Sequence, residues 1–393
     1  MSSHDLQTVP LTSTLIRGAA ELEHTANGVL PHRLPGWARA QCADPQLAMV
    51  EAQPSGVRLA FRTAATVIEL DVHRSRTAYA GLPARPDGII ELVIDGGLAA
   101  HSVTSGGTTV TIDMATGVST TDIGSVHTAR FADLPAEQKD VEIWLPHNEQ
   151  IEVVELRTNA AVDAGPSTRR PVWVHHGSSI SHGSNAVRPT GIWPVVASQL
   201  TGVELVNLGF GGSALLDPFT ARTIRDAPAD VISVKLGINL VNTDLMRLRA
   251  FGPAVHGFLD TIRDGHPTTP LLVISPVFCG IHEDTPGPGA FDLDALRHGQ
   301  LRFRATGDPA ERAAGKLTLS VIRDELTRIV RERQAADTNL HYLDGRELYG
   351  ERDASTHPLP DALHPDAESH RFMGERFARL GLAETLLLAE STS

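Results

Sequence analysis

The spacing of apolar residues changes near residue 160. Before that point, short segments alternate apolar and polar side chains with a period of two, as half-buried strands do. The clearest segments are 57–62, 68–72, 90–94, 110–114, 141–145 and 151–156. Turn residues separate them, such as Asp95-Gly96-Gly97 after the third segment. Many short strands with turns between them predict an all-β sandwich or jelly roll over residues 1–160.

A second pattern follows a polar stretch at 161–170, Ala-Val-Asp-Ala-Gly-Pro-Ser-Thr-Arg-Arg, which we interpret as a linker. In residues 171–393, apolar runs without alternation predict strands covered on both faces. These runs are 171–176, 203–207, 230–236, 270–275 and 339–343. Helix-length stretches accompany them, at 188–200, 245–264, 316–334 and 367–389. The alternation of strand and helix predicts an α/β domain with a parallel sheet.

Length, charge and cysteine content restrict the class of protein. The 393 residues exceed one ordinary core and favour two domains. The net charge of −13 argues against nucleic acid or an anionic membrane as partner. No apolar run approaches the roughly 18–20 residues that span a bilayer, and the first residues lack the pattern of a secretory signal, so we expect a cytoplasmic protein. The two cysteines, Cys42 and Cys279, are then expected to be reduced thiols.

The stretch 172–183 carries the first candidate chemistry. An apolar run ends at Gly177, and small hydroxyl residues follow at once. This predicts a strand that turns sharply into a helix and lifts Ser179 above the carboxyl edge of the sheet. A serine there can attack an acyl carbon if a base takes its proton and donors hold the oxyanion. The structural alternative is a helix N-cap, a role expected for the neighbouring serines: Ser178, Ser181 and Ser184.

Two further stretches contain candidate donors to an oxyanion. Asn207-Leu-Gly-Phe-Gly-Gly212 follows a predicted strand, and a glycine there lets the backbone approach a ligand and direct its N–H inward. Lys235-Leu-Gly-Ile-Asn239 also ends a strand, and its terminal amide can donate a hydrogen bond. We therefore predict an oxyanion hole made of Ser179, Gly212 and Asn239.

A fourth stretch, Asp361-Ala-Leu-His364, precedes the last predicted helix. A carboxylate three residues before an imidazole can accept its Nδ1–H and leave Nε2 free for the proton of a serine. Ser179, His364 and Asp361 are thus the predicted catalytic residues.

These four stretches, in this order, resemble the four sequence blocks of the SGNH (GDSL-type) hydrolase superfamily, over residues 171–390. The resemblance implies a flavodoxin-like domain in which Ser179 is the nucleophile and Asp361 and His364 form the Asp-x-x-His pair. It also assigns Gly212 and Asn239 to the oxyanion hole. Together with the β domain in front, the chain resembles two-domain members that include carbohydrate deacetylases and actinomycete natural-product O-acyltransferases.

Two positions depart from the pattern of the superfamily. Ser178 stands where aspartate is usual, and Leu240 follows Asn239 where aspartate is common. Neither position belongs to the catalytic set, so the departures concern the packing of the loops and the subfamily.

The reaction class is less constrained than the site, because an esterase and an acyltransferase share the steps up to the acyl-enzyme. A cytoplasmic enzyme meets small molecules and acyl-CoA thioesters, and the Gly- and Pro-rich loop 277–313 contains Phe278, Phe291 and Phe303. We interpret the loop as a partly ordered substrate lid that excludes water, with Phe278 and Phe291 contacting the substrate. The prediction is an O-acyltransferase that moves an acyl group from acyl-CoA to a hydroxyl of a small natural product or glycoside. A carboxylesterase or carbohydrate O-deacetylase is the alternative.

Three rival interpretations are weaker. Gly209–Ala214 fits the dinucleotide fingerprint G-x-G-x-x-A, but Pro218 interrupts the helix that should follow, and no acid ends the next strand. The histidines match no familiar metal-ligand spacing, so we expect no metal and no bound cofactor; they are His175, His176, His182, His357 and His370. The third interpretation, a non-catalytic carbohydrate-binding protein, is disfavoured because the complete set of catalytic residues is present.

The sequence makes no prediction of the oligomeric state.

Overall fold

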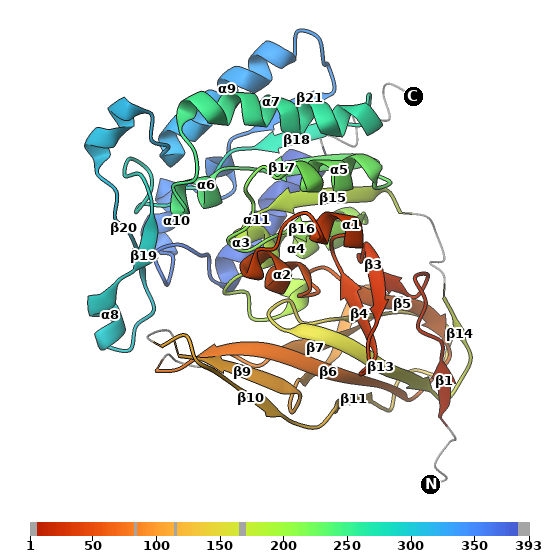
Figure 1. Ribbon diagram of the computed structural model, residues 1–393. Helices are drawn as coiled ribbons and strands as arrows, with labels where there is room; N and C mark the ends of the chain where they lie inside the picture. The colour runs from red at the N-terminus through yellow and green to blue at the C-terminus, as the bar shows by residue number, and fades with distance from the viewer. Residues whose placement is uncertain (1–5, 82–84, 114–115, 165–169, 384–393) are drawn as a thin grey trace. The chain divides into compact units, whose positions relative to one another are not determined.

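The computed structural model describes residues 6–81, 85–113, 116–164 and 170–383 (Figure 1). The chain divides into two compact units. The first comprises Met1–Gly36, Ala48–Arg169 and Arg188–Thr190, and the second Trp37–Leu47, Arg170–Val187 and Gly191–Ser393. The division differs from a single cut at the predicted linker in two short segments, 37–47 and 188–190. Residues 165–169 of that linker lie outside the described residues.

The first unit contains two sheets, as the alternating segments predict. One has the order β10-β9-β6-β13-β4-β3, with β1 beside β13 and β11 beside β6. Its strands are β1 Gln7–Val9, β3 Glu21–His24, β4 Val29–His32, β6 Ile68–Tyr79, β9 Thr108–Ile112, β10 Ser119–Ile123, β11 His127–Phe131 and β13 Gln150–Thr158. The other has the order β14-β5-β12-β7-β8, with β2 beside β5. Its strands are β2 Ile16–Arg17, β5 Arg58–Thr63, β7 Ile89–Ile94, β8 Gly97–Val103, β12 Lys139–Trp144 and β14 Val162–Asp163.

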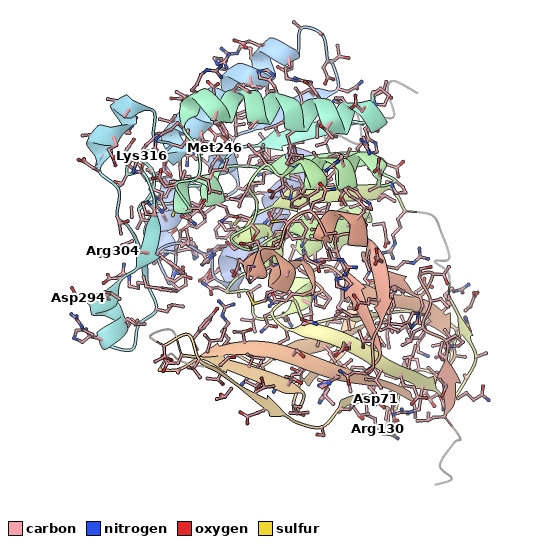
Figure 2. All side chains as sticks on the ribbon, in the orientation of Figure 1. Asp71, Arg130, Met246, Asp294, Arg304 and Lys316 are labelled. Carbon is pink, nitrogen blue, oxygen red and sulfur yellow. The ribbon has the colours of Figure 1, made fainter. Side chains whose placement is uncertain are left out.

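One hydrophobic cluster joins the two sheets. Leu59 of β5 and Leu70 of β6 belong to it, and neither is exposed to solvent. The polar residues that alternate with them form charged pairs, such as Asp71 with Arg157 at 2.6 Å, and Arg130 with Glu69. Figure 2 labels Asp71 and Arg130 on this sheet. A sandwich with an apolar interior and charged outer strands is therefore confirmed for this unit. Met114, at the end of one predicted segment, lies outside the described residues.

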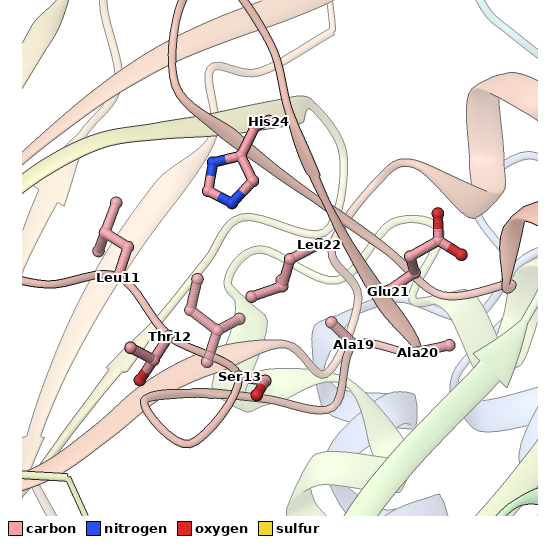
Figure 3. A pocket seen from close by; sticks show the side chains of 9 residues that line it. Leu11, Thr12, Ser13, Ala19, Ala20, Glu21, Leu22 and His24 are labelled. Carbon is pink, nitrogen blue, oxygen red and sulfur yellow. The ribbon is translucent and has the colours of Figure 1, made fainter.

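The first unit also contains a cavity of about 390 Å³ (Figure 3). Small and aliphatic side chains make up most of its lining, and Glu21 and His24 are the ionisable ones. The remaining lining residues are Leu11, Thr12, Ser13, Ile16, Ala19, Ala20 and Leu22.

The second unit is built on a five-stranded parallel sheet with the order β16-β15-β17-β18-β21. In order along the chain, its strands are β15 Val172–Gly177, β16 Glu204–Gly209, β17 Val231–Lys235, β18 Leu271–Ile274 and β21 Leu340–Leu343. The order 2-1-3-4-5 is that of flavodoxin-like folds, whose ligands bind beyond the carboxyl ends of the first and third strands in chain order, here β15 and β17. The predicted α/β class and the parallel sheet are confirmed.

The main helices of this unit are α4 Trp193–Thr201, α5 Pro218–Asp226, α7 Leu248–Gly265, α9 Leu319–Arg333 and α11 Ala367–Phe377. α5 is not among the predicted helices, because a proline such as Pro218 is expected to interrupt a helix. Pro218 is the first residue of α5, where the missing N–H costs nothing and the fixed φ suits a helix. The predicted last helix ends at Phe377, and a π-helical turn continues over Ala378–Ala383. None of the helices in the described ranges combines the length and the apolar composition needed to cross a membrane.

The loop 277–313 is partly ordered, as predicted. β19 Gly289–Phe291 pairs with β20 Phe303–Ala305 in an antiparallel hairpin. The short helix α8 Leu293–Arg297 lies between the two strands in the chain (Figure 1). Asp292 caps α8 by accepting hydrogen bonds from the N–H groups of Asp294 and Ala295.

Candidate active site

Ser179 lies at the sharp turn that the sequence predicts. β15 ends at Gly177, where an added Cβ would lie only 2.3 Å from Oγ of Ser181, so only glycine fits. Ser178 is the N-cap of the short helix α3, Ser179–His182, and its side chain accepts a hydrogen bond from the N–H of Ile180. Ser179 is thus the first residue of the helix, and its side chain lies beyond the carboxyl end of β15.

The hydroxyl of Ser179 is connected to an imidazole and a carboxylate. Its Oγ lies 2.9 Å from Nε2 of His364, and Nδ1 of His364 lies 2.8 Å from Oδ2 of Asp361. The two partners come from the loop before α11, more than 180 residues further along the chain. The structure therefore brings together all three predicted catalytic residues, in the order that lets His364 accept the serine proton.

Asp361 is buried and accepts four hydrogen bonds. Oδ1 accepts from the backbone N–H groups of Leu363 at 2.9 Å and His364 at 2.7 Å. Oδ2 accepts from Nδ1 of His364 and from Nδ2 of Asn185, the latter at 3.1 Å. Burial alone raises the pKa of Asp361, but the hydrogen bonds from His364 and the backbone outweigh it and lower the net pKa. Asp361 is therefore ionised at neutral pH and fixes the orientation of the imidazole.

Asn185 is a contributor that the sequence analysis missed. It has a φ of +66°, a left-handed conformation that asparagine tolerates better than most residues. No local pattern distinguishes it from an ordinary polar loop residue, and only the folded chain places its amide against Asp361.

Gly212 lies in a tight turn after β16. The N–H of Ser213 donates to the carbonyl of Phe210 at 3.1 Å, and Gly212 has a φ of +76°. The N–H of Phe210 donates to the carbonyl of Gly177 at 2.8 Å, which ties this turn to the strand end that precedes Ser179. The segment 209–214 is thus a turn, and the next helix, α5, begins only at Pro218. This geometry removes the basis of the dinucleotide interpretation.

Asn239 follows β17 in the short helix α6, Ile238–Asn242. Its Oδ1 accepts the N–H of Ala214 at 3.1 Å, and the residue is 2% exposed. This bond fixes the amide so that Nδ2 is the end available to a ligand. Because β16, β15 and β17 are neighbours in a parallel sheet, the loops bearing Gly212, Ser179 and Asn239 emerge at the same edge.

The aromatic residues of the loop 277–313 differ in position. The ring of Phe303 meets the ring of His364 edge-on at 5.6 Å, and its N–H donates to the carbonyl of Asp361 at 2.8 Å. Phe291 packs on Phe303 at 5.1 Å. The N–H of Phe278 donates to the carbonyl of Tyr349. The structure thus brings Phe291 near the site through Phe303, and the substrate contact of Phe278 stays a prediction.

The histidines near β15 are structural. His175 lies between the hydroxyls of Ser233 and Ser181 at 2.7 and 2.8 Å. His176 donates from Nδ1 to the carbonyl of Leu208, and His370 from Nε2 to that of Ser184. Over the described ranges, no group of three or more His, Cys, Asp or Glu side chains is placed to hold a metal ion.

Comparison with known proteins gives two matching family models. Residues 169–279 match the GDSL-like Lipase/Acylhydrolase family, and residues 14–154 match the N-terminal domain of SsfX3. The resemblance to the SGNH (GDSL-type) superfamily, in its two-domain form, is therefore confirmed. No curated protein matches the sequence.

Solved structures of similar architecture include the salicylyl-acyltransferase SsfX3 from a tetracycline biosynthetic pathway. It is 26% identical, with a TM-score of 0.80, and the match covers 97% of this chain and 98% of that one. A candidate GDSL-like lipase from Bacteroides ovatus is 19% identical over the same shares, with a TM-score of 0.67. A family two carbohydrate esterase from Clostridium thermocellum is 12% identical, with a TM-score of 0.56 over 85% of this chain and 94% of that one.

These similarities support an enzyme of acyl-transfer or ester-hydrolysis chemistry. The two less similar structures bear on the fold alone, whereas SsfX3 matches in both units of the chain.

Proposed function

We propose that the chain is a serine acyltransferase that works through an acyl-Ser179 intermediate. The observation that carries the proposal is the hydrogen-bonded series Ser179, His364 and Asp361. In the first step, Ser179 Oγ attacks the acyl carbon of the donor while its proton passes to Nε2 of His364. The N–H groups of Ser179 and Gly212 and the amide of Asn239 hold the oxyanion. His364 then returns the proton to the leaving group, and the acyl-enzyme remains.

In the second step, a hydroxyl of the acceptor attacks the acyl-enzyme with His364 as base. The ester leaves, and Ser179 regains its proton from His364. Water in place of the acceptor gives hydrolysis, so transfer requires a site that admits the alcohol in preference to water. The ring of Phe303 against His364 supports this, because it covers the base with an apolar surface.

The end-to-end similarity to SsfX3, a salicylyl-acyltransferase, favours transfer over hydrolysis for this chain. The proposed donor is an acyl thioester such as acyl-CoA, and the proposed acceptor is a hydroxyl of a small natural product or glycoside. SsfX3 is described as a salicylyl-acyltransferase, and salicylyl is an aromatic acyl group. Because the rings of Phe291 and Phe303 also pack together near the site, we propose aromatic acyl groups as the first donors to test.

The test is a mass-spectrometric assay with aliphatic and aromatic acyl-CoA thioesters and a panel of hydroxylated acceptors. We expect ester product to exceed free acid, and Ser179→Ala to lose at least about a thousandfold in rate. Ser184→Ala is the matched control, because Ser184 bonds Ser179 and His370 through its backbone, and it should retain activity. A fluorophosphonate should label Ser179.

If Ser179→Ala retains turnover, the nucleophile is wrong. If every acceptor leaves only free acid while simple esters are cleaved quickly, the enzyme is a carboxylesterase or carbohydrate O-deacetylase.

A further inference from the structure

The turn that carries Gly212 is built around a peptide that can rotate. Phe210 and Ser213 close it with a hydrogen bond of 3.1 Å, and the two central residues are Gly211 and Gly212. Gly212 has a φ of +76°, which is the value of the third residue of a type II turn. A type I turn differs mainly by rotation of the central peptide. With glycine on both sides, no Cβ opposes that rotation.

The orientation of this peptide decides what the site presents to an oxyanion. In a trans peptide, the carbonyl of Gly211 and the N–H of Gly212 point in opposite directions. If the N–H of Gly212 is an oxyanion donor, the carbonyl of Gly211 must point away from the reacting carbon. The flipped peptide would instead present a carbonyl oxygen, which repels the developing negative charge.

One side chain binds that carbonyl. Nε2 of Gln46 donates to the carbonyl oxygen of Gly211 at 2.8 Å. Cγ of Gln46 also lies 3.4 Å from the place where a Cβ on Gly212 would be. Gln46 therefore binds Gly211 and lies next to the side of Gly212 on which a Cβ would be.

Gln46 belongs to the segment Trp37–Leu47, which groups with the second unit. It is in the first turn of α2, Pro45–Glu51. Asp44 caps that turn by accepting the N–H of Leu47 at 2.7 Å, and Leu47 is 3% exposed. The segment is also held to α5, where the guanidinium of Arg222 lies 5.4 Å from the ring of Trp37 and bonds the amide of Gln41. These contacts place the Gln46 amide before any substrate binds.

We infer that Gln46 is a positioning residue of the reaction: by binding the Gly211 carbonyl, it keeps the Gly212 N–H directed at the oxyanion. The inference rests on the proposed function of Gly212. It assigns a role to a segment that lies far in sequence from every block of the superfamily pattern.

The test compares Gln46→Met, which keeps the length of the side chain without the donor, and Gln46→Glu, which replaces the donor by a second acceptor. One hydrogen bond of this kind shifts a conformational equilibrium roughly three- to tenfold. We expect kcat to fall by about that factor in Gln46→Met, and further in Gln46→Glu, because the carboxylate repels the Gly211 carbonyl. KM should stay within about twofold.

Gln41→Ala is the matched control, since it removes an amide from the same segment that bonds Arg222 and not Gly211. It should leave kcat unchanged. Phenylboronic acid, whose tetrahedral adduct with a serine places an oxygen in the oxyanion hole, should lose affinity for Gln46→Met by the same factor as kcat. A merely structural role would not produce that parallel loss.

Two outcomes overturn the inference. If KM rises in Gln46→Met while kcat is unchanged, Gln46 contacts the substrate directly. If Gln41→Ala lowers kcat as much as Gln46→Met, the whole segment acts through stability. Failure of the proposed function is distinguishable, because Ser179→Ala would then retain turnover whatever the Gln46 variants do.

Discussion

Mild acid should destabilise the second unit, because three of its buried histidines, two in β15 and one in α11, are held neutral. Burial lowers the pKa of His176 and of His370 to about 4 and that of His175 well below its ordinary value. The contacts explain why a second proton is excluded. Nε2 of His176 is buried with no hydrogen-bond partner, and Nδ1 of His370 accepts the N–H of Trp193 at 3.4 Å.

The sign of the effect follows from proton binding in the two states. In the unfolded chain these histidines take up a proton near pH 6.5. In the folded chain His176 and His370 do not until about pH 4, and His175 also stays neutral well below pH 6.5. The contribution of the neutral histidines to the unfolding free energy is fully present above pH 6.5 and is lost progressively as the pH falls below that value. Each one costs about 1.4 kcal/mol of unfolding free energy per pH unit in that window.

Asp217 acts in the opposite direction, because burial, with the charge of Asp44 adding to it, raises its pKa to about 6. Below pH 6, its folded form binds a proton that the unfolded form does not. This proton uptake stabilises the folded state and offsets the loss of unfolding free energy caused by up to one histidine. The net loss between pH 6.5 and pH 5 is then on the order of a few kcal/mol, a large part of the stability of a typical domain.

The measurement is urea unfolding at several pH values between 5 and 8, followed by tryptophan fluorescence. In a Trp144→Phe background, the signal comes from Trp37, Trp173 and Trp193, all in the second unit. His176→Phe, whose new ring would lie between Phe210 and Phe258, should reduce the pH slope by about one proton. Val187→Ala, at an exposed position of the same unit and without a titratable group, should leave the slope unchanged. An equal unfolding free energy at pH 5 and pH 7, or an unaltered slope in His176→Phe, would refute the reasoning.

Two further predictions concern the site. Asn185→Gly keeps the left-handed backbone but removes one donor from Asp361, so kcat should fall about three- to tenfold with KM unchanged; full activity would show that the other three donors suffice. Phe303→Ala uncovers His364, so the ratio of free acid to ester in the transfer assay should rise, whereas Phe372→Ala, whose ring packs on Tyr349, should leave it unchanged. Equal ratios in the two variants would show that Phe303 does not control the entry of water.

The sheet of the second unit and the blocks around Ser179 could be predicted because local constraints determine them. Strands covered on both faces need continuous apolar runs, and each of the five runs is a strand. The turn after β15 needs a glycine at Gly177, and the Asp-x-x-His spacing by itself allows Asp361 to reach His364. Such requirements are visible within a few residues of sequence.

The contributions of Asn185, Gln46 and Phe303 could not be predicted in the same way. Each is a single side chain in a loop, a short helix or a short strand, and its partner lies more than 50 residues away. Only tertiary structure brings such groups together. The loop 277–313 contains three phenylalanines, and nothing in their spacing favours Phe303 over the other two as the neighbour of His364.

The grouping of Trp37–Leu47 with residues 170–187 and 191–393 makes the second unit discontinuous in sequence. During synthesis, this segment leaves the ribosome long before the strands to which it belongs, so the unit cannot be completed until the chain is nearly finished. The first unit also cannot be exchanged for a foreign β domain by a single cut at the linker. A hybrid joined at 161–170 to a foreign β domain would inherit a foreign stretch at the place of 37–47, and with it another side chain in place of the one that binds Gly211. An exchange of domains that keeps the second unit intact has to carry these eleven residues across the junction.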